Sequence, residues 1–388
     1  MDMVWRTMTL LLLPLLAVTV ACSSPHRPSS DRTEAAAVDS AAVADSLLRV
    51  RADSAVRALT PEQRAGMLLM PAMFTRHDAP TLRQLRHYAL DTHAGGIVLL
   101  RGDTLSARII ADTLRSMGRA DMILSIDAEW GLGMRLEDAP SYPVNGELAT
   151  YASERLMRSY GSRVAQQCRR LGINMVLGPV VDVVPEGGQS IMSRRSFGAD
   201  PARVARLASA YARALEEGGV ISVAKHFPGH GSVPEDSHRT LPVLYKSLHL
   251  LQSQDLLPFR IYVDSGMSGI MVGHIAVPAV DPDIQPAAVS AAVITDLLRN
   301  DMNFQGLILT DALNMGGAEG APAWKAVAAG ADLVLAPADT DAARRDILAA
   351  IERGDLTQAE VDAHCRRIFY YIYKLRSPRR RPQPHTMS

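Results

Sequence analysis

One short segment of the chain concentrates side chains that can move protons or hold hydroxyl groups. Lys225, Asp236 and three histidines fall within 14 consecutive positions. Gly229 and Gly231 let the backbone approach a ligand closely, and Pro228 fixes part of its path. An imidazole titrates near neutral pH, so it can both give and take a proton. The segment is therefore predicted to be a shaped, chemically active loop on a rigid scaffold.

Eight short apolar runs separated by helical patterns are predicted to form buried parallel strands. Eight strand–helix units fit a (β/α)8 TIM-type barrel, typically about 250 residues, better than a doubly wound sheet. We therefore expect a single α/β catalytic domain over residues 57–375. The runs are Leu68–Met73, Ile97–Leu100, Ile123–Ile126, Asn174–Gly178, Val220–Ala224, Gly269–Val272, Leu307–Leu309 and Leu333–Ala336.

Polar side chains follow five of these runs. In such a barrel the carboxyl ends of the strands meet at one mouth, where the chemistry takes place. We expect these side chains to converge there, which scattered helix caps and loop residues would not do. They are Asp127, Asp182, the pair Lys225 and His226, His274, and Asp311.

Five motifs in order make the chain similar to bacterial β-N-acetylglucosaminidases of glycoside hydrolase family 3. The loop motif is KHFPGHG at residues 225–231, followed by Asp-Ser-His at residues 236–238. The resemblance spans the chain from about Thr60 to about Tyr373, without the second, sandwich domain of many family members. The other motifs lie in the segments Ser125–Arg135, Gly178–Val183, Arg195–Pro201 and Leu309–Met315.

The resemblance implies a retaining mechanism through a covalent glycosyl-enzyme. Asp311 matches the nucleophile and His238 the general acid/base, with Asp236 holding one ring nitrogen of His238. His274 is expected either to bind the sugar or to brace Asp311. The residues that match sugar ligands are Asp127, Arg135, Arg195, Lys225 and His226.

Two departures from the family pattern affect this assignment. Trp130 lies in a run, Trp-Gly-Leu-Gly-Met-Arg, that replaces a Glu-Gly-Gly run and is expected to reshape the mouth near Asp127. Arg194 stands beside Arg195, which leaves open which of these two arginines contacts the sugar.

Other functions remain open at this stage. The main alternatives are an exported β-glucosidase of the same family and a non-catalytic barrel that binds cell-wall sugars. In the retaining mechanism, phosphate could also replace water as the second nucleophile, which would make the enzyme a phosphorylase. A metal-dependent hydrolase fits less well, because barrel hydrolases gather ligands from several strands whereas these histidines cluster on one segment. The preferred expectation is removal of terminal β-linked N-acetylglucosamine from peptidoglycan fragments or chito-oligosaccharides, with no metal or organic cofactor.

The net charge and the two ends of the chain indicate what the protein binds and where in the cell it acts. The 41 basic residues balance 41 acidic ones, which argues against nucleic-acid binding as the main function. Residues 1–22 are predicted to be a signal peptide of the lipoprotein type, with Cys22 as the lipidated residue. Residues 23–56 are expected to form a tether and lead-in, and residues 376–388 a basic, proline-rich tail. We therefore expect an exported, membrane-anchored monomer that acts on oligosaccharides outside the cytoplasm.

Overall fold

The computed structural model describes residues 30–376 of the 388-residue chain. The predicted signal peptide with Cys22, residues 23–29 of the tether and residues 377–388 of the tail lie outside the described residues. The chain divides into two units, Met1–Leu47 and Leu48–Ser388, and helix α1 (Ser30–Arg57) runs across that boundary. No helix within residues 30–376 has the length and apolar character needed to cross a membrane.

A parallel sheet forms the centre of the second unit. Seven strands pair with their neighbours in chain order. Every side chain of β4, β6, β7 and β8 is buried, as expected for parallel strands covered on both faces. The strands are β2 (Ala72–Thr75), β3 (Gly96–Gly102), β4 (Ile123–Ile126), β5 (Met175–Val176), β6 (Ile221–Phe227), β7 (Gly269–Val272) and β8 (Leu307–Thr310).

Two further strands lie between the ends of this sheet. β1 (Leu69–Met70) pairs in parallel with β9 (Val334–Leu335), and Leu333, just before β9, bridges to Leu309 of β8. Pro71 separates β1 from β2 because it has no N–H group for the ladder, but its carbonyl accepts a hydrogen bond from Val98. The predicted α/β class with a parallel sheet is confirmed, whereas complete closure into a barrel remains a prediction.

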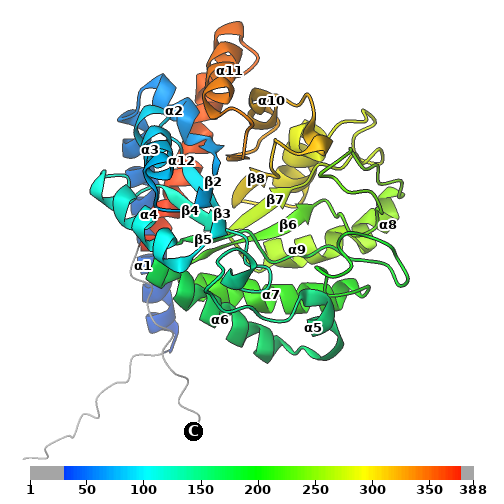
Figure 1. Cartoon of the computed structure of the whole chain (residues 1–388). Coiled ribbons are helices and arrows are strands. Elements are labelled where there is room, and N and C mark those ends of the chain that lie inside the picture. The colour runs from blue at the N-terminus through cyan, green and yellow to red at the C-terminus, as the bar shows by residue number, and fades with distance from the viewer. Residues whose placement is uncertain (1–29, 377–388) are drawn as a thin grey trace, which may run out of the picture. The chain divides into compact units, whose positions relative to one another are not determined.

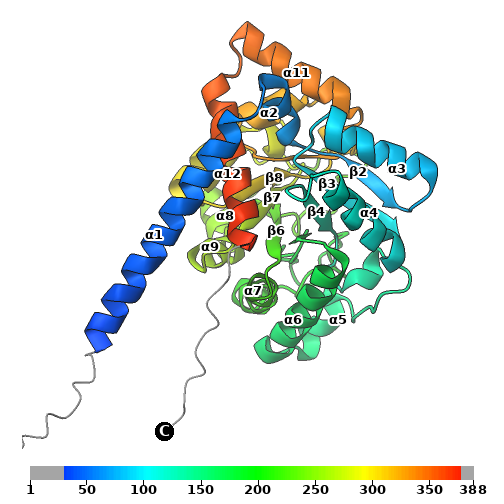
Figure 2. The same ribbon diagram turned by 90° about the vertical axis from the view of Figure 1, so that its left-hand side faces the viewer.

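Helices cover the outside of the sheet (Figures 1 and 2). Helix α6 (Glu154–Leu171) has clear start and stop residues: the Ser153 hydroxyl accepts a hydrogen bond from the Leu156 N–H, and Gly172 ends the helix at a φ of 78°. The other α-helices of the second unit are α2 (Pro61–Met67), α3 (Ala79–Arg86), α4 (Thr104–Ser116), α5 (Asn145–Tyr151), α7 (Pro201–Glu217), α8 (Leu248–Ser253), α9 (Leu256–Asp264), α10 (Ala323–Ala328), α11 (Thr340–Arg353) and α12 (Gln358–Arg376).

Short turns of other helix types complete the path. Two π-helical segments are η1 (His87–Asp91) and η4 (Ala292–Asp301), and three 3-10 turns are η2 (Leu132–Met134), η3 (Ala287–Val289) and η5 (Gly316–Ala318). η2 follows β4 and η5 follows β8, so both belong to the segments after the strands, where the functional side chains were expected.

One difference from the sequence prediction concerns β6. The strand was expected to end at Ala224, but it continues to Phe227, so Lys225 and His226 lie on the strand rather than after it. Their backbones are therefore fixed by the neighbouring chain: Lys225 donates to the carbonyl of Pro179, and its own carbonyl accepts from Val181. Both side chains are consequently positioned by the sheet.

Candidate active site

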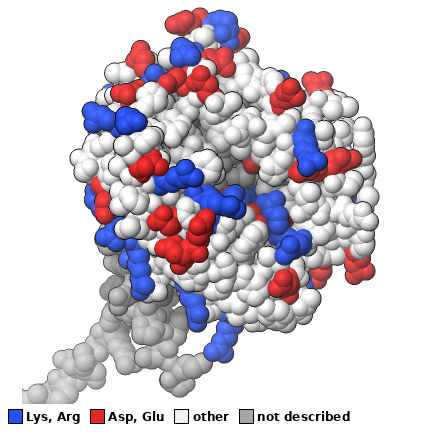
Figure 3. Space-filling model, in the orientation of Figure 1, with Lys and Arg blue, Asp and Glu red and all other residues white. Residues whose placement is uncertain are grey.

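A cavity of about 440 Å³ opens at the carboxyl ends of the strands. It lies in the hollowed centre of the face in Figure 3, where Lys and Arg side chains gather. Seven of the nine predicted catalytic and sugar-binding residues line it, whereas Asp236 and His274 do not. The seven are Asp127, Arg135, Arg195, Lys225, His226, His238 and Asp311.

Oppositely charged side chains form a network along one wall of the cavity. The buried Lys225 Nζ lies 2.7 Å from Asp127 Oδ1 and 2.9 Å from Glu129 Oε1. Arg135 Nη2 contacts Asp127 Oδ2 at 2.5 Å. Arg195 binds Glu129 through two parallel bonds, Nη2 to Oε1 at 2.6 Å and Nε to Oε2 at 2.9 Å. Paired donors of this kind hold the arginine in one orientation.

The network keeps both carboxyl groups ionised. Burial by itself would raise the pKa of Asp127, but the charges of Lys225 and Arg135 outweigh it and hold that pKa well below its usual range. For Glu129, burial is likewise outweighed by Lys225 and Arg195, which lower its pKa to about 2. The wall therefore offers fixed, charged hydrogen-bonding groups, which bind hydroxyl groups strongly where water is excluded.

Glu129 is a site residue to which sequence reasoning gave no role. It has no exposed side-chain area and makes the two-bond contact that orients Arg195. A signal was present in the sequence, because Glu129 stands two positions after Asp127 and alternate residues of an extended segment point to the same side. Asp127 and Glu129 thus present their carboxylates to the same lysine.

Replacement of Lys225 by Met should destabilise the fold. It leaves two carboxylates buried without their shared cation, and removal of one partner from a buried ion pair costs about 3–5 kcal/mol in free energy of unfolding. Urea unfolding measures this loss. The control is Arg158→Met, which breaks the exposed pair with Glu217 and should cost less than about 1 kcal/mol. Equal losses in the two variants would show that the buried network contributes nothing special to stability.

Asp182, at the end of the β5 segment, positions two histidines. Its Oδ2 lies 2.8 Å from His226 Nδ1, and its Oδ1 accepts hydrogen bonds from the backbone N–H groups of His226 and His230. The opposite nitrogen of His226, Nε2, lies 3.3 Å from Arg195 Nη2 on the cavity wall. His226 is therefore held by a carboxylate behind it and presents its other edge to the cavity.

Asp311 follows β8 directly. Its backbone N–H donates to the carbonyl of Val272, and its Oδ1 accepts from Ala312 N–H at 2.8 Å. Its other oxygen, Oδ2, has no hydrogen-bond partner within residues 30–376. Burial would raise the pKa of Asp311, but His226, His274 and the Ala312 N–H together lower it. Asp311 is thus an ionised carboxylate with one oxygen free at the cavity.

His274 lies outside the cavity and supports the Asp311 segment. The side chain is fully buried, and its Nε2 lies 3.1 Å from the carbonyl oxygen of Ala312, the residue after Asp311. This contact is with the segment that carries Asp311, and the role of His274, sugar binding or bracing of Asp311, stays a prediction.

His238 stands on the open side of the cavity. About 61% of its side chain is exposed, and its Nδ1 lies 2.7 Å from Asp236 Oδ1. The same carboxylate oxygen accepts a hydrogen bond from the His238 backbone N–H, which lowers the pKa of Asp236. Asp236 thus does not touch the cavity but fixes the ring of His238.

The loop that carries His238 is tied to the segment that carries Asp311. Gly316 donates to the carbonyl of His238 at 3.1 Å, and Gly317 donates to that of Ser237 at 2.9 Å. A Cβ atom at Gly317 would lie 2.7 Å from the Ser237 carbonyl oxygen, so the close approach requires glycine. His230 supports the loop from inside, with Nε2 2.8 Å from Ser237 Oγ. The loop with His238 and the segment with Asp311 are therefore held in a fixed position relative to each other.

The structure also bears on the two departures noted in the sequence. Arg195, not Arg194, lines the cavity, and Arg194 is exposed without lining it. Trp130 and Met134 contribute to the wall beside Asp127. Within the described part of the chain, no group of three or more His, Cys, Asp or Glu side chains is arranged to hold a metal ion.

Comparison with known proteins identifies the relatives of this chain. Residues 62–370 match the family model described as "Glycosyl hydrolase family 3 N terminal domain". A β-hexosaminidase of Neisseria meningitidis serogroup A is 35% identical over 262 residues, which cover 63% of this chain and 72% of that protein. A β-N-acetylglucosaminidase/β-glucosidase of Cellulomonas fimi is 31% identical over 71% of this chain, and the match spans 51% of that longer protein.

A solved structure gives the same picture. The family 3 β-N-acetylglucosaminidase of Paenibacillus sp. FPU-7 superposes with a TM-score of 0.75 at 28% identity. The superposition covers 85% of this chain and 65% of the Paenibacillus chain.

Proposed function

The chain belongs to glycosyl hydrolase family 3, a family of glycoside-cleaving enzymes, and we propose that it is a retaining exo-β-N-acetylglucosaminidase. Its substrates would be peptidoglycan fragments or chito-oligosaccharides with a terminal β-linked N-acetylglucosamine. The observation that carries this proposal is the placement of Asp311 and His238 on one cavity, with a free Asp311 oxygen and a His238 ring oriented by Asp236.

In the first step, Asp311 Oδ2 attacks the anomeric carbon while the bond to the leaving oxygen breaks. His238 in its imidazolium form donates Nδ1–H to Asp236 and transfers the proton on Nε2 to that oxygen. The products are a covalent glycosyl-enzyme and a protonated, neutral aglycone. The exposure of His238 on the open side of the cavity fits this role, because the aglycone must leave toward solvent.

In the second step, water replaces the aglycone. The neutral Nε2 of His238 accepts a proton from the water as its oxygen attacks the anomeric carbon, and the bond to Asp311 breaks. Two displacements at the same carbon retain the β configuration. Phosphate could take the place of water in this step, since a neutral histidine base repels an anionic nucleophile less than a carboxylate would, so product analysis with and without phosphate belongs to the test.

The charged wall would hold the terminal sugar. Asp127, Lys225 and His226 are assigned to hydroxyl groups of that sugar, and Arg135 and Arg195 to the rim of the same subsite. Glu129 already holds Arg195, and Asp182 already holds His226. Binding of the sugar would therefore cost these two side chains little conformational entropy.

The experiment that tests the function compares aryl β-N-acetylglucosaminide with aryl β-glucoside, each with and without a chelator. We expect the acetamido sugar to be hydrolysed with a clear advantage in kcat/KM and without sensitivity to the chelator. A preference for the glucoside would favour the β-glucosidase alternative, which the double name of the Cellulomonas relative also raises. Binding of sugars without turnover would favour a non-catalytic barrel.

Two further proposals concern the whole chain. We propose that it is exported and anchored through lipidated Cys22, on the strength of the apolar segment that precedes this cysteine. Metabolic labelling with a radioactive fatty acid, compared between the natural chain and Cys22→Ser, tests it. We also propose that the sheet closes into a (β/α)8 barrel through β9 and β1, supported by the pairs of β9 with β1 and of Leu333 with Leu309.

A further inference from the structure

The outer surface of helix α6 carries an excess of positive charge that the cavity does not use. The helix contains five arginines and one acidic residue, Glu154. Arg158 pairs with Glu217 at 2.8 Å. The other four have no ion-pair partner within residues 30–376: Arg155, Arg163, Arg169 and Arg170. These four guanidinium groups are therefore available to an external anion.

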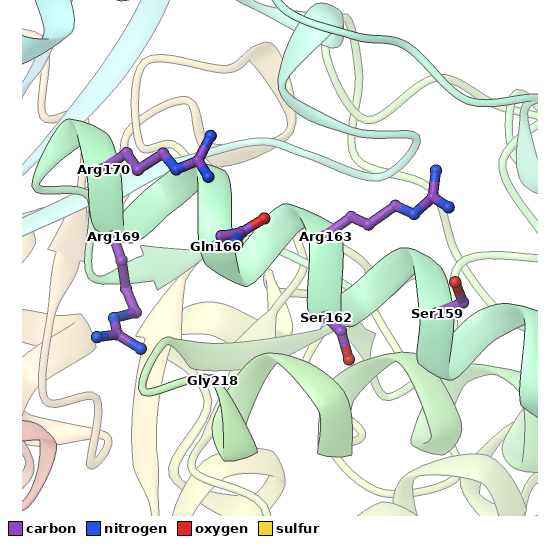
Figure 4. Close-up of a pocket in the computed structure, with 7 residues that line it drawn as sticks. All are labelled: Ser159, Ser162, Arg163, Gln166, Arg169, Arg170 and Gly218. Carbon is purple, nitrogen blue, oxygen red and sulfur yellow. The ribbon is translucent and has the colours of Figure 1, made fainter.

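Three of these arginines, Arg163, Arg169 and Arg170, border a shallow hollow of about 820 Å³. Figure 4 shows Arg163, Gln166 and Arg170 on one side of α6 and Arg169 on the side of Gly218. No apolar side chain lines the hollow, and its side chains are hydrogen-bond donors, so it suits a hydrated anion rather than an apolar ligand. The lining residues are Ser159, Ser162, Arg163, Gln166, Arg169, Arg170 and Gly218.

Helix stability explains only part of this charge. Arg169 and Arg170 lie in the last turn of α6, where cations favourably oppose the helix dipole. Arg163 lies in the middle of the helix and Arg155 in its first turn, where a cation is unfavourable. An anionic partner at the hollow accounts for Arg163, Arg169 and Arg170, whereas the dipole accounts for the last two only.

The basic surface continues toward the last helix. Glu216, two residues before Gly218, lines a small gap together with Tyr371 and Lys374 of α12. Those two residues also border a hollow of about 500 Å³, in which Asp53 balances the charge of Arg366 at 2.8 Å and Lys374 is a further cation. Both gaps lie at the amino ends of the strands, because Ile221 of β6 and Gln305, just before β8, line them. This basal surface is opposite to the end that carries the cavity.

Cations and tyrosines lie together on the basal surface. Lys374 Nζ is 5.2 Å from the centre of the Tyr371 ring, and the Arg51 guanidinium is 4.1 Å from that of Tyr373. Long cationic side chains and tyrosines combine an apolar body with a polar end, which suits the boundary between lipid and water. α12 (Gln358–Arg376) brings Tyr371, Tyr373 and Lys374 to this surface.

We propose that this basal surface binds the anionic phosphate head groups of a phospholipid membrane. The chain as a whole is neutral, so the attraction arises from the local excess on this surface and not from net charge. The orientation would place the cavity on the side away from the lipid, where a glycan can reach it. The proposal goes beyond the glycosidase reaction and would hold even if the sugar specificity were different.

The test uses the chain from Ser23 to Ser388, which has no lipid anchor. The vesicles are made of phosphatidylcholine alone or of phosphatidylcholine with about 30 mol% of the anionic lipid phosphatidylglycerol. We expect sedimentation with the anionic vesicles only, and loss of binding as salt rises. Arg169→Glu/Arg170→Glu should lower the partition coefficient about tenfold or more. Hydrolysis of a soluble aryl glycoside should stay unchanged, because both residues lie outside the cavity.

The matched control is Arg83→Glu/Arg86→Glu. This pair also lies in the last turn of a helix, α3, and makes the same change in net charge. Equal loss of binding in the two double variants would overturn the proposal, since it would indicate a response to net charge. So would equal binding to both kinds of vesicle, no binding to either, or displacement from anionic vesicles by a soluble polyglycerol phosphate at equal phosphate concentration, which would indicate a polymer-binding surface instead.

Discussion

Asp311→Ala is expected to reduce hydrolysis of an aryl β-N-acetylglucosaminide by roughly 10⁴-fold or more, the scale seen when a nucleophile is removed from an enzyme with a covalent intermediate. The reason lies in the site. Asp311 is ionised, held at the end of β8 and hydrogen-bonded through one oxygen only, so its other oxygen is free to attack. Glu129 and Asp127 also line the cavity, but both are occupied by cations.

A second measurement separates loss of the nucleophile from loss of the fold. Azide added to Asp311→Ala should enter the space left by the carboxylate and attack an activated aryl glycoside, giving the α-glycosyl azide. Thermal unfolding of the variant should stay close to that of the natural chain and of Asp264→Ala, an exposed aspartate at the end of α9. A fully active Asp311→Ala, or a β-configured azide product, would contradict the assignment of the nucleophile.

The sequence predicted the architecture well where pattern and topology leave little choice. Parallel strands with helices between them bring their carboxyl ends to one edge, so the polar residues at five strand ends had to approach each other. The structure places Asp127, Lys225 and Asp311 on one cavity accordingly. The bounds of α6 were predictable as well, because Ser153 and Gly172 are strong start and stop signals.

What the sequence could not supply was the pairing between side chains. The sequence motif assigned Lys225 to the sugar, and only the structure shows its ion pairs with Asp127 and Glu129. The choice between Arg194 and Arg195 depends on which of them meets Glu129, 66 positions away in the chain. Such contacts form between loops whose relative positions are set by the whole sheet, so local patterns carry no record of them.

The same limit applies to His274. Its position after a predicted strand pointed toward the mouth, which made sugar binding and bracing equally consistent with the sequence. The structure shows that the Nε2 atom of His274 lies 3.1 Å from the carbonyl oxygen of Ala312. Strand position fixes where the backbone of a residue lies, whereas the direction of the side chain depends on the packing around it.

His238→Ala is expected to slow the enzyme by an amount that depends on the leaving group. A general acid contributes about 10²–10⁴-fold when the aglycone needs a proton, so an alkyl β-N-acetylglucosaminide should lose about that much in kcat/KM. A dinitrophenyl aglycone leaves without protonation, and its kcat/KM should change little. Because His238 also activates water in the second step, the dinitrophenyl substrate should show a rapid burst of released phenol followed by slow turnover.

Asp236→Ala should give a smaller version of the same pattern, because it leaves the ring of His238 in place but removes the 2.7 Å contact that orients it. Steady-state and stopped-flow measurements on the two substrates, with His249→Ala as the control at another exposed histidine, test both variants. Equal losses on the alkyl and dinitrophenyl substrates would show that His238 does not transfer the proton. A loss in Asp236→Ala that shows no dependence on the leaving group would show that Asp236 supports the loop and not the proton transfer.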